Sequence, residues 1–329
     1  MTETIRIEGL TRRYGRTIAV SGVDLAVEDS EILGLVGPNG AGKTTTLRML
    51  STLLVPSDGD AWIMGHSIRH APDKVRRVIG YMPDSFGVYD DMRVWEYLDF
   101  FARCYSIPGA RRKRLVADLL ELVDLGHKRD DYVQSLSRGM QQRLCLAHTL
   151  VNDPPVLLLD EPASGLDPRA RIELRELIRE LRDLGKTVLI SSHILPELEE
   201  LCTRVAIIDH GRVLAHGEVS EIERRLRRGA VLRVTVAGDA DAVAAAERAL
   251  AADPSVTSAT TLPDGRIEIG VPGDDAGMAA LLARLIRDGH PIAGFAPAVS
   301  DLEELFLQVT ELREPGIDGS ASSGEGLAA

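Results

Sequence analysis

A glycine-rich segment at positions 37–44 reads Gly-Pro-Asn-Gly-Ala-Gly-Lys-Thr. Glycines let the backbone wrap around an anion with its N–H groups pointing inward, and a following helix adds the positive end of its dipole. In such a loop, Lys43 can reach the β- and γ-phosphates of a nucleoside triphosphate, and the Thr44 hydroxyl can ligate Mg²⁺. The spacing therefore predicts a site for a nucleoside triphosphate with magnesium.

Two adjacent acids, Asp160 and Glu161, end the apolar run 156–159. A carboxylate at the end of a buried strand can hold the ligand sphere of Mg²⁺, and Asp160 has this position. Glu161 projects to the opposite side and can orient or deprotonate an attacking water. Acids here could simply mark a strand leaving the core, but the phosphate-binding loop upstream favours the catalytic interpretation.

A third feature is the start of a helix expected over residues 138–151, where Ser137 is placed as the N-cap and Gly139 follows. Apolar residues recur along it at helical spacing, at Met140, Leu144, Ala147 and Val151. A second helix N-terminus with serine and glycine is a second possible anion site. One chain would then carry two phosphate-facing surfaces.

Strands and helices must alternate to position these residues. Strands are expected at 4–8, 10–14, 31–36, 60–64, 156–160 and 187–191, and helices at 45–53, within 91–125, at 138–151 and at 169–184. This alternation predicts an α/β domain over residues 1–225, with a mostly parallel sheet and the nucleotide at its carboxyl edge. Residues from about 85 to 150 form a helical subdomain in this scheme.

The composition changes near Gly229, and the order expected beyond it is strand, helix, strand, strand, helix, strand. This βαββαβ order predicts a small ferredoxin-like α+β domain over residues 230–312. Its last helix begins at Ser300, where Ser300 and Glu303 form a capping box. Residues 314–329 are small and polar and are expected to be disordered. We interpret this domain as an accessory element for regulation or dimerisation.

The charge balance and the apolar pattern exclude several classes of protein. The chain has 329 residues and a formal net charge of −12, which argues against nonspecific nucleic-acid binding. It lacks an uninterrupted apolar run of the ~18–20 residues that a membrane span requires, and it lacks an N-terminal secretory signal. We therefore expect a cytoplasmic protein that meets a membrane only through a partner. The three separated cysteines are expected to be buried, reduced thiols.

Taken together, the motifs of residues 1 to about 220 resemble the ATP-binding subunit of an ABC transporter, a P-loop NTPase. Residues 37–45 match the Walker A loop, 136–141 the signature motif, 160–161 Walker B with its catalytic glutamate, and 164–167 the D-loop. The residues that the resemblance assigns to ATP are Tyr14, which would stack on adenine, Val20, Gly37, Pro38, Asn39, Gly40, Ala41, Gly42, Lys43, Thr44, Thr45, Asp84, Ser137 and Gly139.

The resemblance also implies roles in hydrolysis. Glu161, Lys43 and the switch histidine His193 would be catalytic, and Thr44, Asp84 and Asp160 would hold Mg²⁺. Considered without its context, Tyr14 would more often be a packing or surface tyrosine, and His193 a structural histidine. The order of the motifs favours the functional roles.

Two positions depart from the pattern that this family usually shows. Asp84 stands where a glutamine is usual, and a carboxylate close to phosphates and to other acids is unfavourable unless it lies near Mg²⁺ or turns away. We expect Asp84 to ligate Mg²⁺ directly. In the signature motif, Arg138 and Met140 replace glycine and glutamine, while Ser137 and Gly139 are retained. Arg138 would place a positive charge where the γ-phosphate arrives.

The mechanism implied by the resemblance is an ATP sandwich of two identical copies, arranged head to tail. A separate transmembrane permease would be the second partner, docking near residues 85–89 and the aromatic helix 93–105, although plain helical packing explains those aromatics equally well. The expected function is an ATPase that drives an exporter at the cytoplasmic face of the membrane. The alternative is a soluble ABC ATPase acting on ribosomes or DNA, a class that usually carries two cassettes or a long coiled-coil insertion.

Overall fold

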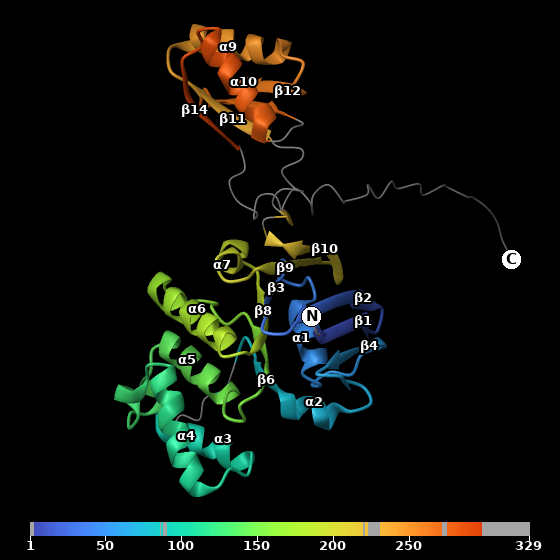
Figure 1. The fold of residues 1–329 in the computed structure, drawn as a ribbon, viewed down its shortest axis with the longest axis vertical. Coiled ribbons are helices and arrows are strands. Elements are labelled where there is room, and N and C mark those ends of the chain that lie inside the picture. The colour runs from blue at the N-terminus through green and yellow to red at the C-terminus, as the bar shows by residue number, and fades with distance from the viewer. Residues whose placement is uncertain are drawn as a thin grey trace, which may run out of the picture. The chain divides into compact units, whose positions relative to one another are not determined.

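The computed structural model describes residues 3–85, 87, 91–219, 221–222, 231–271 and 275–297. The chain divides into two compact units, Met1–Arg225 and Leu226–Ala329, which are coloured along the chain in Figure 1 and described here one at a time. The helix expected from Ser300, the tail 314–329 and part of the segment 85–89 lie outside the described residues.

A six-stranded sheet forms the centre of the first unit, in the order β10-β9-β3-β8-β7-β6. Its strands are β3 (Ile32–Val36), β6 (Ile79–Met82), β7 (Val156–Asp160), β8 (Thr187–Ser192), β9 (Arg204–Asp209) and β10 (Arg212–Glu218). All neighbours are parallel except β10, which runs antiparallel to β9. Every residue of β3, β7 and β8 is buried, as expected for parallel strands covered on both faces.

The register of this sheet decides where the site lies. Val36 pairs with Ser192, and Asp160 pairs with Ser191. The segments that follow β3, β7 and β8 therefore leave the sheet side by side at its carboxyl edge. This edge holds the phosphate-binding loop, the two acids and His193, as the alternation of strands and helices predicts.

A second, antiparallel sheet in the order β2-β1-β4-β5 was not predicted from the sequence. It consists of β1 (Glu3–Tyr14), β2 (Thr17–Glu28), β4 (Asp58–Ile63) and β5 (His66–Ser67). The two strands expected within residues 4–14 are one strand with irregularities in its register, and β2 was missed. Residues such as Ile7, Leu25 and Ile63 from this sheet share one apolar core with α1 and the central sheet.

Seven α-helices are described in the first unit. They are α1 (Lys43–Leu50), α2 (Pro72–Val78), α3 (Val94–Cys104), α4 (Gly109–Leu122), α5 (Arg138–Thr149), α6 (Pro168–Asp183) and α7 (Leu195–Glu199). Figure 1 shows α3, α4 and α5 gathered apart from the antiparallel sheet. Among the described residues, no helix is both long and apolar enough to cross a bilayer.

Aromatic residues of α3 pack within the helical group. The Phe101 ring stacks on His148 of α5 at 3.6 Å between centroids, and Tyr97 is buried beside both rings. Burial lowers the pKa of His148 to about 4, so this ring is neutral at physiological pH. Packing thus accounts for these two aromatics, whereas Phe100 is exposed. Cys145 and Cys202 are buried as expected, but the expectation is wrong for Cys104, which is exposed near the end of α3.

The second unit has its elements in the order strand, helix, strand, strand, helix, strand. They are β11 (Val231–Val236), α9 (Ala240–Ala252), β12 (Ser258–Thr261), β13 (Ile267–Gly270), α10 (Asp275–Arg287) and β14 (Ile292–Pro297). The strands form one antiparallel sheet in the order β12-β13-β11-β14. Its alternate residues Leu232, Val234, Ile267 and Ile269 form a core with Leu250 and Leu281 of the helices.

Candidate functional site

The phosphate-binding loop connects β3 to α1 through a backbone that suits only glycine at several positions. Gly40 and Gly42 have φ values of 86° and 108°, in the left-handed region. A Cβ on Gly37 would lie 2.2 Å from the carbonyl oxygen of Ile208. No side chain caps α1 at Gly42, so the first N–H groups of this helix are available to an anion.

Replacing Gly42 by alanine is expected to destabilise the protein. The new Cβ would lie 2.6 Å from the carbonyl oxygen of Ala19, and the left-handed backbone alone costs about 1–3 kcal/mol for a non-glycine residue. We expect the free energy of unfolding in urea to fall by at least that range. Gly185→Ala is the matched control, because Gly185 has φ 87° but no atom within 4 Å of its Cβ position. An equal loss in both variants would contradict the close approach at Gly42.

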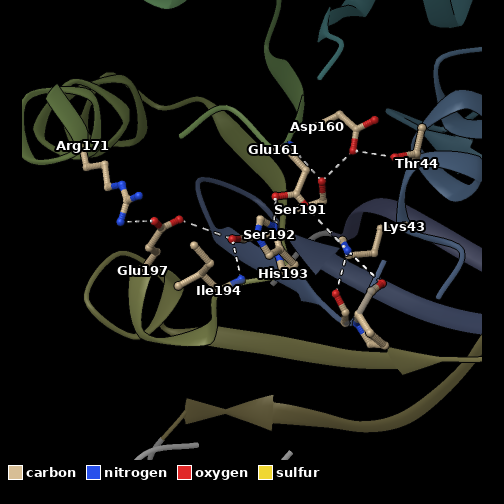
Figure 2. A network of polar contacts seen from close by, with 12 residues as sticks. Lys43, Thr44, Asp160, Glu161, Arg171, Ser191, Ser192, His193, Ile194 and Glu197 are labelled. Carbon is tan, nitrogen blue, oxygen red and sulfur yellow. Dashed lines mark hydrogen bonds and ion pairs between the residues drawn. The ribbon is translucent and has the colours of Figure 1, made fainter. Parts of the chain in front are cut away.

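Lys43, the first residue of α1, is 5% exposed, and its ammonium group is fully engaged. Nζ donates to the carbonyl oxygens of Gly37 at 2.6 Å and Pro38 at 3.2 Å. It also lies 3.2 Å from Oε1 of Glu161, whose side chain is 12% exposed. The loop backbone therefore holds a positive charge at its own centre, beside the carboxylate that follows β7 (Figure 2).

Asp160 is the last residue of β7 and is 1% exposed. Its Oδ1 accepts hydrogen bonds from the hydroxyls of Thr44 at 3.1 Å and Ser191 at 2.7 Å. Its Oδ2 is buried and has no hydrogen-bond partner among the described residues. Burial is the main cause that raises the pKa of this carboxyl above its ordinary value. An acid with one unpartnered oxygen beside a threonine hydroxyl fits a divalent cation, because a cation would supply the missing compensation.

Glu161 lies between two cationic or polar partners. Its Oε2 is 2.8 Å from Nδ1 of His193 and 3.4 Å from the His193 backbone nitrogen, while its Oε1 faces Lys43. The Glu161 N–H donates to Oγ of Ser191 at 3.0 Å, at a backbone φ of 49°. Figure 2 shows Lys43, Glu161 and His193 converging at the carboxyl edge of the sheet. The structure thus brings together the three residues expected to be catalytic.

Ser191 was not singled out from the sequence. Its hydroxyl donates to Asp160 and accepts from the backbone of Glu161, so it fixes both acids. The sequence could have indicated Ser191, because a hydroxyl side chain inside a buried strand such as β8 requires polar partners.

Three further residues with a predicted role in binding are Asp84, Tyr14 and Val20. Asp84 is exposed just beyond β6, and its charge is one of the causes that raise the pKa of Asp160, after burial and Glu161. Tyr14 ends β1, is 47% exposed, and has the Arg12 guanidinium 4.8 Å from its ring centroid. Val20 is buried beneath the loop, with Cγ2 3.3 Å from the Cβ position of Gly42.

Ser137 and Gly139 begin α5, away from the loop. Ser137 is the N-cap, and its Oγ accepts a long hydrogen bond of 3.4 Å from Met140 N. In Figure 1, α5 and α1 lie apart. The Arg138 guanidinium packs against Gly165, where a Cβ would lie 2.5 Å from its central carbon. In this structure Arg138 thus contacts the segment 164–167 of its own chain, a contact that the sequence did not predict.

Comparison with known proteins now identifies the class. Residues 20–164 match the family model described as ABC transporter. The chain is 38% identical over 309 residues to the daunorubicin/doxorubicin resistance ATP-binding protein DrrA of Streptomyces peucetius, covering 94% of this chain and 93% of that protein. It is 40% identical over 221 residues to a Nod factor export ATP-binding protein I of Ralstonia nicotianae, covering 67% and 69%. A solved ATP-binding subunit of an ABC transporter matches with a TM-score of 0.61 and 30% identity, covering 68% of this chain and 93% of that one.

The fold, the site and these likenesses define the class of protein. The chain belongs to the ABC transporter family and is an ATP-binding subunit of that family. It is an ATPase whose hydrolysis is coupled to transport.

Proposed function

We propose that the chain powers an exporter, with the side chains at the carboxyl edge of the central sheet performing hydrolysis. The observation that carries this proposal is the placement of Glu161 between Lys43 and His193, beside the phosphate-binding loop. The relatives that support export are named for drug resistance and for Nod factor export. The transported compound is recognised by the membrane partner.

Each residue has a separate task in this reaction. The loop N–H groups and Lys43 bind the β- and γ-phosphates, which neutralises charge on the transferring group. Glu161 orients the attacking water and accepts its proton. His193 holds the Glu161 carboxylate through Nδ1 and can approach the γ-phosphate with the other ring nitrogen.

Magnesium would be held by Thr44 and Asp160, whose side chains already face one another across 3.1 Å. When bound, the cation neutralises the phosphate oxygens and polarises the γ-phosphate. We assign Asp84 as a third ligand for two reasons. Its charge contributes to the raised pKa of Asp160, and its exposed side chain can turn toward the nucleotide. Tyr14 would stack on adenine above Val20, with the remaining loop residues around the phosphates.

Replacing Asp84 by asparagine is expected to raise the Mg²⁺ concentration that gives half-maximal ATP hydrolysis, by roughly tenfold, because a neutral amide oxygen is a weaker ligand than a carboxylate. Steady-state ATPase assays across a Mg²⁺ titration measure this shift. Asp84→Gln supplies the residue usual in the family; it lacks the charge, as asparagine does, but its side chain is one methylene longer, so it shows whether a longer neutral side chain restores the Mg²⁺ dependence. An unchanged Mg²⁺ dependence in the asparagine variant would exclude Asp84 as a ligand.

Ser137 and Gly139 would complete the site in a second copy. Since α5, at whose start both residues lie, is apart from α1 in Figure 1, we infer that two copies stack head to tail with ATP between them. The helix N-terminus at Ser137 then faces the γ-phosphate bound by the partner. Binding of ATP closes this dimer, and hydrolysis opens it.

The other parts of the chain serve this assembly. We assign residues 1–225 as the ATP-binding domain and residues 230–312 as an accessory domain of the ferredoxin-like type, which the strand order β12-β13-β11-β14 supports. A separate permease would dock at the helical subdomain, where Phe100 is exposed, and would hold the protein at the cytoplasmic face of the membrane.

Affinity capture from detergent-solubilised membranes tests the transport assignment. We expect a multi-span membrane protein, encoded by a neighbouring reading frame, to copurify and to raise the ATPase rate. Capture of ribosomes or DNA without a membrane protein would favour the alternative, a soluble ABC ATPase.

A further inference from the structure

A chain of polar contacts connects the segment 164–167 to the strand end that carries His193. Arg171 on α6 lies at its centre. Its Nε donates to the carbonyl oxygen of Leu166 at 3.0 Å, and its NH1 is 3.1 Å from Oε1 of Glu197 on α7. Figure 2 shows this ion pair beside the cluster of Lys43, Glu161 and His193. The mechanism proposed above gives the ion pair no role in hydrolysis.

Glu197 carries the connection to both sides of His193. Its Oε2 accepts from the Ser192 hydroxyl at 3.4 Å, and the same hydroxyl accepts from the Ile194 N–H at 3.0 Å. The residue before His193 and the residue after it are therefore joined to one another and to Glu197. A shift of Glu197 would therefore move the backbone at His193. It would also change the 2.8 Å contact between His193 Nδ1 and Glu161 Oε2.

The apolar side chains of α6 and α7 do not fill the space between these two helices. A hollow of about 320 Å³ separates α6 from β8 and α7, and it is lined by Ile172, Ile178 and Ile194, among others. The Glu197 side chain is 18% exposed and the Arg171 side chain 39% exposed, so water screens this ion pair in part. Burial raises the pKa of Glu197, while the charge of Arg171 and the hydrogen bond from Ser192 oppose this shift. The ion pair of Arg171 with Glu197 links α6 to α7 across this hollow, as does the ion pair of Arg175 with Glu200 at the end of α7.

We propose that Arg171 and Glu197 are positioning residues for ATP hydrolysis, which hold His193 against Glu161 and tie it to the segment 164–167. This rests on the roles of Glu161 and His193 proposed above. Neither residue touches the reacting atoms in this account. Their effect is geometric, and a displacement of about 1 Å at a reacting centre can cost ~100-fold in rate.

The full-length chain with Arg171→Met, with Glu197→Gln, and with both substitutions tests this proposal. Methionine keeps most of the apolar stem, and glutamine keeps an acceptor for Ser192. We expect each single variant to lower kcat about tenfold while KM for ATP changes less than about twofold. Because both changes break one interaction, the double variant is expected to be no worse than the poorer single variant.

Arg175→Met is the matched control. Arg175 also lies on α6 and pairs with Glu200 at the end of α7, but its ion pair involves neither Ser192 nor Leu166. We expect this control to lower Tm as much as Arg171→Met while leaving kcat near the wild-type value. Equal kcat values for Arg171→Met and Arg175→Met, or additive effects in the double variant, would overturn the proposal. If Arg171→Met does not fold, Glu197→Gln against Arg175→Met decides.

His193→Ala, measured in the same series, separates this inference from the function on which it rests. If His193→Ala abolishes hydrolysis and the two positioning variants match the control, only the further inference fails. If His193→Ala hydrolyses ATP normally, the role of His193 fails, and with it the need to position this residue.

Discussion

Glu161→Gln is expected to lower the turnover number for ATP by at least ~100-fold, because glutamine cannot accept a proton from water. The substituted side chain keeps nearly the volume of glutamate and an acceptor oxygen for Lys43 or for the His193 backbone N–H. We therefore expect ATP to remain bound, and the two-copy form to accumulate. Phosphate-release assays measure turnover, and light scattering with ATP measures the mass of the assembly.

Glu173→Gln is a suitable control, since Glu173 pairs with Arg169 and Arg143 on the helical side of the unit, away from the loop. We expect it to hydrolyse ATP at the wild-type rate. Normal hydrolysis by Glu161→Gln would remove Glu161 from the mechanism.

Lys43→Ala is expected to weaken ATP binding by ~100-fold or more. The ammonium group is buried and is held at the loop centre by two carbonyl oxygens, so no exposed cation can replace it at the phosphates. A loss of this size corresponds to about 2.7 kcal/mol of binding free energy. Its removal also leaves Glu161 without its cationic partner at 3.2 Å. Isothermal titration with ATP in the presence of Mg²⁺ measures the change.

Lys186→Ala provides the comparison for this loss. Lys186 is also partly buried and bonds a carboxylate and a carbonyl, Asp153 at 2.7 Å and Pro154 at 2.9 Å, but it lies outside the site. We expect it to bind ATP as the wild-type chain does. If Lys186→Ala loses as much affinity for ATP as Lys43→Ala does, the loss in Lys43→Ala comes from general destabilisation and not from a lost contact with the phosphates.

Much of the central sheet and its edge could be predicted, because the pattern that indicates each strand or loop lies within one short segment of the sequence. The run before Asp160 contains only apolar residues, and the strand expected at 156–160 is the strand observed. The glycine loop predicts its own backbone shape, since Gly40 and Gly42 adopt the left-handed conformations that other residues avoid. The N-cap at Ser137 is also confirmed.

The parts that were missed depend on pairing between distant segments. β2 has buried Val23, Leu25 and Val27 in alternation, but its partner β1 and their irregular register could not be read from either segment alone. The contact of Arg138 with Gly165 and the pair of Arg171 with Glu197 join residues 26 or more positions apart. Ser191 could have been found, because a hydroxyl in a buried strand must have a partner.

The ATP sandwich of two copies can be tested by measuring the mass of the ATP-bound assembly when Ser137→Glu is added to Glu161→Gln. A carboxylate at the start of α5 would face the γ-phosphate held by the other copy and repel it. We expect Glu161→Gln to form a dimer with two ATP molecules, and the double variant to bind ATP but remain a monomer. A double variant that dimerises with ATP as readily as Glu161→Gln would refute the ATP sandwich, because Ser137 of one copy would then not contact ATP bound to the other.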